Sequence, residues 1–326
     1  MMQLDLRPEK LRQYTGISPC PQDIDAFWDG EIAAMKAIDP QVELIKVIDY
    51  PNAECFDLYF TGMNGARVYA KYARPKHIER PLPCVLRFHG YGAQSPDWME
   101  LLAWTGQGVC AAALDVRGQG GKSQDVGGVR GNTRRGHIIR GLGEMNPHKL
   151  LFKDIFLDTA QLADIVMRFD EVDSNDVCIY GDSQGGGLTI ACAALEPRIK
   201  KAAAWYPFLS DYKRVWELDR DERAYEELRT YFRDFDPRHE REDEIFGILG
   251  YIDIQNIAGR IQSEVLMFSG LLDEICPPST HFAAYNKIKS RKKALVYPDY
   301  AHEIFPGSMD VVMQWFLHDV LPDSKY

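Results

Sequence analysis

From residue 83 onward, short and almost wholly apolar runs alternate with stretches in which apolar residues recur at a helical period. A strand that is apolar on both faces has to be buried on both faces, and a parallel sheet covered by helices meets this requirement. The pattern therefore predicts an α/β fold with a mostly parallel central sheet and helices on both faces. The strand-like runs are CVLRFHG, VCAAALDV, DVCIYG, KAAAWYP, EVLMFSG and KALVYPD.

Before these runs, apolar and polar residues alternate in QVELIKVIDY, ECFDLYFTG and ARVYAKYARP. The last two are joined through Asn64 and Gly65, a dipeptide typical of tight hairpin turns. The three segments predict antiparallel strands at the start of the sheet. Helices are expected near 97–108 and 153–168, directly after Ser183, and near 310–320.

The segment from about 211 to 258 is rich in charged and aromatic residues, and we interpret it as a mostly helical insertion on the sheet. A chain of 326 residues can build one large core. We therefore expect a single α/β-hydrolase domain over 1–326, with an N-terminal extension over about 1–40.

The formal net charge of −10 argues against nucleic acid as a partner, because binding phosphates requires a basic face. Basic residues gather only at 130–140 and 290–293. No stretch reaches the roughly 18 uninterrupted apolar residues of a membrane span, and the first residues lack the pattern of a signal peptide. The seven cysteines lie mostly in apolar runs and form no CxxC pair, which is typical of reduced, buried thiols. We expect a cytoplasmic protein with no membrane partner, no metal and no other cofactor.

Ser183 lies in CIYGDSQGGGLTI, residues 178–190, between an apolar strand-like run and a second apolar run. The order strand, G-x-S-x-G, helix is the setting of a nucleophilic serine on a tight turn. A Walker loop would need Lys and then Ser or Thr after its last glycine, but Leu188 follows Gly187, and the spacing does not give G-x-G-x-x-G. The alternative is a glycine-rich turn that happens to contain serine. The context favours Ser183 as a nucleophile.

An α/β-hydrolase supplies its catalytic residues in the order Ser, then Asp or Glu, then His. Asp273 follows the strand-like run EVLMFSG, and His302 follows KALVYPD, so both lie where a carboxyl end of a strand is expected. Glu274 and Asp299 are the rivals for the acid. The other seven histidines lie outside this last strand-end loop: His89 belongs to the HG dipeptide that turns the chain toward the oxyanion hole, and most of the rest are expected to be surface or packing residues. The rest are His77, His137, His148, His239, His281 and His318.

An oxyanion hole usually takes one backbone N–H from the residue after the nucleophile and one from the loop after an early strand. These donors are expected from Gln184 and from Tyr91 in FHGYG. Four aromatic residues next to these loops are expected to bind substrate and to crowd the acyl side: Tyr91, Trp205, Tyr206 and Phe208.

In combination these motifs resemble the acetyl xylan esterases and cephalosporin-C deacetylases, a carbohydrate-esterase branch of the α/β-hydrolases. The resemblance covers most of the chain, and the succession of RGQ, G-x-S-Q-G and HE is its most specific part. The matching segments are FHGYG at 88–92, Arg117-Gly118-Gln119, HIIRGL at 137–142, GDSQGGG, YPFLSD at 206–211, LLDEICPPST at 271–280 and His302-Glu303.

The resemblance implies serine-dependent removal of acetyl groups from small acetylated sugars, and a homohexamer whose active sites face an inner cavity. Two positions depart from the pattern. Asp182 stands where Gly or Ala is expected, and Ala301 stands where Gly is expected. Asp182 adds a negative charge near the nucleophile that can alter leaving-group preference. For Arg117 and Gln119 we expect a structural role, because an arginine at the end of a buried strand more often anchors loops than contacts substrate.

Three other functions fit parts of the pattern. A general short-chain esterase would use the same residues, and so would a peptidase-type α/β-hydrolase. The latter normally carries a propeller or a large lid, and no internal repeat is visible in the sequence. A non-catalytic binding scaffold would typically have lost the serine or the histidine, and this chain keeps both.

Overall fold

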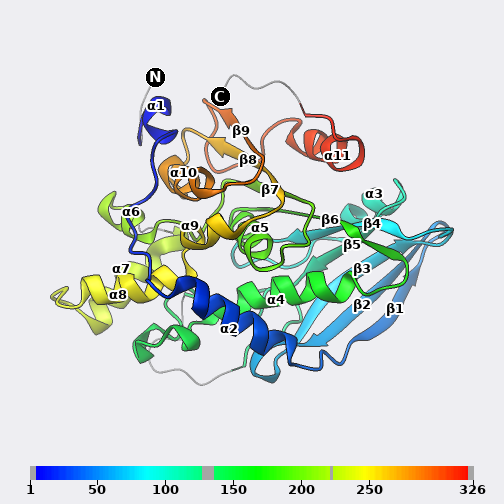
Figure 1. The fold of residues 1–326 in the computed structure, drawn as a ribbon, viewed down its shortest axis with the longest axis horizontal. Helices are drawn as coiled ribbons and strands as arrows, with labels where there is room; N and C mark the ends of the chain where they lie inside the picture. Colours follow the sequence, from blue (N-terminus) through cyan, green and yellow to red (C-terminus); the bar gives the residue numbers. More distant parts are fainter. Residues whose placement is uncertain (1–4, 127–135, 221–222, 322–326) are drawn as a thin grey trace.

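The computed structural model describes residues 5–126, 136–220 and 223–321, and a nine-stranded sheet runs through its centre (Figure 1). The strand order is β1-β2-β3-β5-β4-β6-β7-β8-β9. The strands are β1 (Glu43–Asp49), β2 (Ala53–Thr61), β3 (Arg67–Pro75), β4 (Leu82–Phe88), β5 (Cys110–Leu114), β6 (Val172–Asp182), β7 (Lys201–Trp205), β8 (Glu264–Gly270) and β9 (Lys292–Tyr297).

The sheet has two parts that differ in strand direction. Strands β1, β2, β3 and β5 pair antiparallel in that succession, whereas β5, β4, β6, β7, β8 and β9 are parallel neighbours. Between β2 and β3, Asn64 and Gly65 have φ values of +58° and +74°, the left-handed turn conformation that these two residue types tolerate best. The predicted α/β-hydrolase fold is confirmed, with its antiparallel start.

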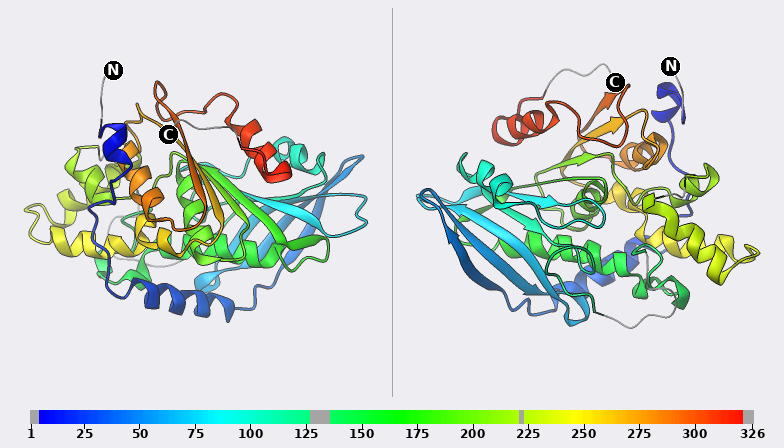
Figure 2. Two further views of the ribbon diagram at one scale, coloured as in Figure 1. Left: turned by 45° about the horizontal axis from the view of Figure 1, so that its top comes forward. Right: turned by 180° about the vertical axis from the view of Figure 1, so that it is seen from behind.

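Helices cover both faces of the sheet (Figure 2). Neighbouring residues of one strand enter different cores: Val85 packs with one apolar cluster and Leu86 with the other, which is why the parallel strands are apolar throughout. One face carries α2 (Ile24–Lys36), α4 (Leu151–Val166) and α5 (Gln184–Leu195), and the other carries α3 (Trp98–Thr105) and α11 (Ser308–His318).

The described residues of the stretch 211–258 form four α-helices, of which α6, α7 and α8 lie to the left of the sheet in Figure 1 and α9 packs against α5. They are α6 (Tyr212–Glu217), α7 (Glu226–Phe235), α8 (Glu242–Leu249) and α9 (Ile254–Ile257). The remaining helices are α1 (Pro8–Leu11) and α10 (Pro278–Lys287), which lie next to each other. Of the basic stretch 130–140, residues up to 135 lie outside the described part of the chain.

Two of the longer helices, α2 and α10, fall outside those that the sequence pattern predicts. Helix α2 buries Ile24, Phe27, Trp28 and Met35, a helical spacing that closer inspection of the N-terminal extension would have shown. Helix α10 buries polar side chains, including Ser279, Thr280 and His281, so its buried face gives no apolar periodicity.

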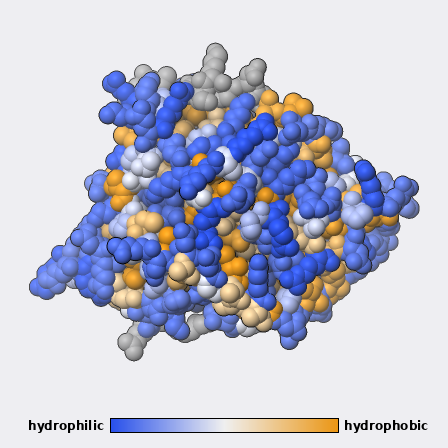
Figure 3. Space-filling model, in the orientation of Figure 1, coloured by the Kyte–Doolittle hydropathy of each residue, from blue (hydrophilic) through white to orange (hydrophobic). Residues whose placement is uncertain are grey.

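Polar side chains dominate the surface, and apolar ones are scattered among them on the face in Figure 3. Among the described residues, no helix has the length and apolar character needed to cross a membrane. All seven cysteines are free thiols, six of them buried and Cys20 exposed.

Candidate active site

Ser183 occupies a strained turn between β6 and α5. Its backbone has φ +55° and ψ −118°, a conformation that residues with a Cβ rarely adopt. The turn is held from β7 and the residues after it: the N–H of Ser183 donates to the carbonyl of Trp205 (3.0 Å), and the N–H of Phe208 donates to the carbonyl of Ser183 (2.9 Å). A tight strand-to-helix turn of this kind displays the serine hydroxyl at the end of the sheet.

The glycines around Ser183 are needed because backbone segments approach closely. A Cβ on Gly181 would lie 2.4 Å from the carbonyl carbon of Gly185, and a Cβ on Gly185 would lie 2.0 Å from the carbonyl oxygen of Phe88. Both distances are far below van der Waals contact, so a side chain on Gly181 would push the start of α5 away from β6, and a side chain on Gly185 would push it away from β4.

Three of the residues singled out in the sequence meet at the carboxyl edge of the sheet. His302 Nε2 lies 3.0 Å from Ser183 Oγ, and His302 Nδ1 lies 2.8 Å from Asp273 Oδ2. Ser183 follows β6, Asp273 follows β8 and His302 follows β9, so parallel strands deliver all three side chains to one edge. This is the geometry of a nucleophile, a general base and the acid that orients it.

Asp273 is buried and firmly held. Its Oδ1 accepts hydrogen bonds from the N–H groups of Ile275 (2.9 Å) and Cys276 (2.8 Å), which leaves Oδ2 for His302. The rival acid Glu274 points elsewhere: its side chain is about half exposed, with Oε1 3.8 Å from Arg220 Nη2. Asp299 is exposed as well.

A second histidine, His281, stands behind Asp273. It is fully buried, with Nδ1 2.9 Å from Ser269 Oγ and Nε2 4.0 Å from Asp273 Oδ2. Burial lowers the pKa of His281 to about 4, so its ring is neutral at neutral pH. Asp273 therefore lies between the neutral imidazole of His281 and the imidazole of His302, which contacts Ser183. The sequence offered no signal for this neighbour.

The loop after β4 and the start of α5 are joined by a glutamine from the RGQ segment. Gln119 Nε2 donates to Gln184 Oε1 (2.6 Å), and Gln119 Oε1 accepts from Gln184 Nε2 (3.0 Å) and from the N–H of Gly92 (2.8 Å). The two segments expected to supply oxyanion donors, around Tyr91 and at Gln184, are thereby fixed to each other. Gln184 itself is fully buried at the first position of α5, where backbone N–H groups lack helical partners.

Arg117 anchors the RGQ segment to helix α4. It is fully buried and pairs in a bidentate manner with Asp158 of α4, through Nε (2.6 Å) and Nη2 (2.5 Å). Burial raises the pKa of Asp158 to about 6, and the charge of Arg117 opposes that rise. Arg117 and Gln119 thus tie loops together, as expected from the sequence.

The phenol of Tyr91 points into the helical insertion. Its hydroxyl donates to Glu227 Oε1 of α7 (2.7 Å) and accepts from the N–H of His137 (3.0 Å). Glu227 is buried, and its Oε2 accepts from the N–H of Ile139 (3.0 Å). Burial raises the pKa of Glu227 to about 7, while these hydrogen bonds oppose the rise. A carboxylate of the insertion therefore braces the loop that carries Tyr91, and sequence inspection missed it.

The four aromatic residues expected at the acyl side lie on two sides of Ser183. Phe208 packs against Tyr91, with ring centroids 5.5 Å apart. Tyr206 instead packs against His302 (4.5 Å), and Trp205 stacks on Phe268 (4.6 Å). Trp205 and Tyr206 border a separate cavity on the His302 side.

Asp182, the departure next to the nucleophile, belongs to an ion-pair network. Arg87 Nη2 lies 2.5 Å from Asp182 Oδ1, and Arg87 Nε lies 2.9 Å from Glu100 Oε1. The hydroxyl of Tyr180 also donates to Glu100 (3.0 Å). The added charge of Asp182 is thus partly compensated by Arg87 from β4.

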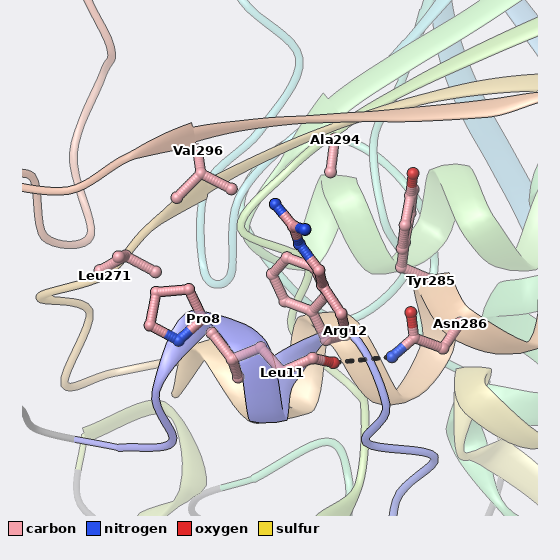
Figure 4. Close-up of a pocket in the computed structure, with 9 residues that line it drawn as sticks. Pro8, Leu11, Arg12, Leu271, Tyr285, Asn286, Ala294 and Val296 are labelled. Atoms are coloured by element: carbon pink, nitrogen blue, oxygen red, sulfur yellow. Dashed lines mark hydrogen bonds between the residues drawn. The ribbon is translucent and has the colours of Figure 1, made fainter. Parts of the chain in front are cut away.

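A hollow of about 290 Å³ lies apart from this site, between α1, α10 and β9 (Figure 4). Asn286 Nδ2 donates to the carbonyl of Leu11 there (2.8 Å), so the hollow is closed on one side by the N-terminal segment. Its lining is mainly apolar, with Pro8, Leu271 and Val296 facing inward. Among the described residues, no cluster of three or more His, Cys, Asp or Glu side chains could hold a metal ion.

Known proteins are similar to this chain in sequence and structure over nearly its whole length. An acetyl esterase, Axe7A, from Xylanibacter ruminicola is 26% identical over 321 residues, which span 96% of this chain and 70% of that protein. The structure of acetyl xylan esterase 1 from Thermoanaerobacterium sp. JW/SL YS485 is 56% identical, with a TM-score of 0.94 and coverage of 96% of this chain and 98% of the other. An acetyl xylan esterase from Paenibacillus sp. R4 is 34% identical, with a TM-score of 0.91 and coverage of 95% and 99%.

The model of the acetyl xylan esterase (AXE1) family matches residues 1–319. A match of this extent, together with the two close structural relatives, establishes the family suggested by the RGQ, GDSQG and HE motifs. The chain belongs to the acetyl xylan esterase (AXE1) family, a family of carboxylic ester hydrolases.

Proposed function

We propose that this chain removes acetyl groups from small acetylated substrates through an acyl-enzyme formed on Ser183. The observation that carries the proposal is the continuous chain of contacts from Ser183 Oγ to His302 Nε2 (3.0 Å) and from His302 Nδ1 to Asp273 Oδ2 (2.8 Å). The family contributes the acetyl ester as the substrate.

In the first half of the reaction, His302 Nε2 takes the proton of Ser183 as Oγ attacks the carbonyl carbon. The tetrahedral oxyanion accepts hydrogen bonds from the N–H groups of Gln184 and Tyr91. The ester C–O bond then breaks, and the imidazolium gives its proton to the departing alcohol. Asp273 orients the ring and stabilises its positive charge.

In the second half, His302 takes a proton from water as the water oxygen attacks the acetyl carbon of the acyl-enzyme. The bond to Ser183 Oγ breaks, Oγ recovers the proton from His302, and acetic acid leaves and ionises to acetate in water. Two classes of acetyl ester fit the family: neutral esters, the acetylated xylo-oligosaccharides, and anionic esters of the cephalosporin C type.

The test is hydrolysis of p-nitrophenyl acetate by the purified protein and by S183A. We expect turnover by the wild type and none above background by S183A, because the change removes only the nucleophilic hydroxyl. The matched control is S174A, which removes a hydroxyl at the opposite end of β6 and should keep full activity. A fluorophosphonate should label Ser183 covalently, and labelling at another residue instead would overturn the assignment.

A further inference from the structure

A cavity of about 270 Å³ lies next to residues that contact or adjoin the proposed nucleophile and base. Its lining includes Asp182, which precedes Ser183 in the chain, and Tyr206, whose ring centroid lies 4.5 Å from that of His302. Its lining residues are Arg87, Glu100, Tyr180, Gly181, Asp182, Trp205, Tyr206, Ile304, Ser308 and Met309.

The chemistry of an acyl transfer places the leaving alcohol on this side. The carbonyl oxygen of the ester has to lie at the N–H groups of Gln184 and Tyr91, whereas the alcohol oxygen has to receive a proton from His302 Nε2. The group attached to that oxygen therefore extends past His302, away from Tyr91. Tyr206, which packs on the ring of His302, lines the cavity together with Ile304.

We propose that this cavity receives the alcohol part of the ester and that Asp182, with Glu100, selects uncharged, hydroxyl-rich alcohols over anionic ones. The proposal rests on the proposed function, since it assigns the alcohol side of that same reaction.

Charge is the first reason for this selectivity. Asp182 and Glu100 contribute two negative charges and Arg87 one positive charge, which leaves one net negative charge on the polar side of the cavity. The three guanidinium nitrogens of Arg87 donate to Glu100, to Asp182 and to the carbonyl of Phe88, so the cation is engaged by the protein. An incoming carboxylate meets repulsion there, whereas sugar hydroxyls can donate to the carboxylate oxygens.

Accessibility is the second reason. The side chains of Asp182 and Glu100 are 36% and 37% exposed, so both can contact a bound group, although they are paired with Arg87. The opposite wall is apolar, and Ile304 is 85% exposed at the mouth of the cavity. An apolar wall facing polar acceptors suits a sugar ring, which has an apolar face and a rim of hydroxyls.

The size of the effect follows from Coulomb's law. Consider a unit negative charge that lies about 7 Å from a carboxylate of the ligand, at an effective dielectric constant between about 20 and 80. Deleting that charge changes the binding of the ligand roughly 3- to 50-fold. Loss of the charge of Asp182 should therefore improve hydrolysis of anionic esters by about this factor relative to neutral ones.

The experiment measures kcat/KM for two acetyl esters, a neutral acetylated methyl xyloside and the carboxylate-bearing cephalosporin C, in the wild type, D182N and E100Q. We expect the ratio of anionic to neutral kcat/KM to rise roughly 3- to 50-fold in D182N, and in the same direction in E100Q. The matched control is D170N, which removes an exposed charge near the opposite end of β6 and should leave the ratio unchanged.

A measurement on the wild type alone keeps the proposal testable if either variant misfolds. Added salt screens the repulsion, so the ratio of anionic to neutral kcat/KM should rise between about 0.01 and 1 M ionic strength. The assignment of the cavity is overturned if salt leaves the ratio of anionic to neutral kcat/KM unchanged, or if that ratio stays the same in folded D182N and E100Q. Turnover of the neutral ester would still support the esterase in that case. A wild type that hydrolyses neither ester overturns the proposed function itself.

Discussion

The two sides of Ser183 are built in opposite ways. On the oxyanion side, Glu227 is 4% exposed and holds Tyr91 and the N–H of Ile139 in a buried set of hydrogen bonds. On the alcohol side, Asp182 is 36% exposed and belongs to an ion pair that faces a cavity. The comparison suggests a division of labour. In the proposed reaction, buried contacts hold the loop that positions the ester carbonyl, whereas the open, charged side faces the departing alcohol.

The largest effect is expected where the two sides meet. Asp273→Asn should lower kcat for p-nitrophenyl acetate by about 10⁴-fold, because an amide would favour the wrong tautomer of His302. The matched control is E274Q, since Glu274 is about half exposed and turned toward Arg220. Equal losses in both variants would mean that the acid has been misassigned.

Local sequence patterns were sufficient for this central part of the site. Ser183, Asp273 and His302 each follow an apolar run that forms a parallel strand, and the carboxyl ends of such strands meet at one edge. The six strands from β4 onward were predictable because burial on both faces leaves an apolar run in each one, whereas β1, β2 and β3 were predictable from the alternation of apolar and polar residues.

The supporting contacts could not be predicted in this way. Tyr91 and Glu227 are 136 positions apart, and Arg87 and Asp182 are 95 positions apart. No periodicity in a strand or helix shows which loop or helix will fold back onto it, so a buried carboxylate in an insertion looks like any surface glutamate. His281 escaped notice for a related reason, because the buried face of α10 is polar.

The next effect concerns the pH dependence of the protein's stability, and it arises from the buried Glu227 on the oxyanion side. Burial raises the pKa of Glu227 from 4.5 to about 7, so its stabilising contribution is fully present below pH 4.5 and is lost as the pH rises through about 7. The loss corresponds to about 3 kcal/mol. Thermal unfolding between pH 4.5 and 8 should therefore show a steeper loss of stability in the wild type than in E227Q.

Asp158 and Asp253 also contribute to the pH dependence of stability in this measurement. Burial raises the pKa of each to about 6, so both act in the same pH window, but they are present in both proteins. The difference between wild type and E227Q therefore isolates Glu227. Identical pH profiles for the two proteins would show that the ionisation of Glu227 is not coupled to folding.

Glu227 should also affect the reaction by positioning the loop of Tyr91. In E227Q, the amide N–H₂ faces either the N–H of Ile139, which then loses its acceptor, or the phenol of Tyr91, which then has to accept instead of donate. A misplacement of the donor by about 1 Å can lower kcat about 10²-fold. We expect kcat to fall while KM changes little, with E226Q as the exposed control on the same helix.

The same variant sharpens the comparison between the two sides. Because the oxyanion hole serves every ester alike, E227Q should lower kcat for neutral and anionic acetyl esters by the same factor. A change in their ratio would mean that the two sides are coupled, and the proposed division of labour would fail.

The smallest effect concerns the length of the acyl group. With the alcohol pointing past His302, the acyl group lies toward Tyr91 and Phe208, whose ring centroids are 5.5 Å apart, and Tyr225 packs behind Phe208 at 4.4 Å. Rings this close leave room for a methyl group, and forcing extra methylenes into a packed site costs about 1 to 3 kcal/mol. That cost corresponds to a roughly 5- to 150-fold loss. We expect kcat/KM for p-nitrophenyl esters to fall steadily from acetate to butyrate to octanoate.

Phe208→Leu tests whether these rings set the limit. The smaller side chain should raise the ratio of octanoate to acetate kcat/KM, whereas Met309→Ala, on the alcohol side, should leave that ratio unchanged because the cavity it lines does not receive the acyl group. If octanoate were hydrolysed as well as acetate by the wild type, the acyl side would have to be as open as the alcohol side. The contrast between a closed and an open side would then no longer explain the specificity, and a general esterase would fit better than a deacetylase.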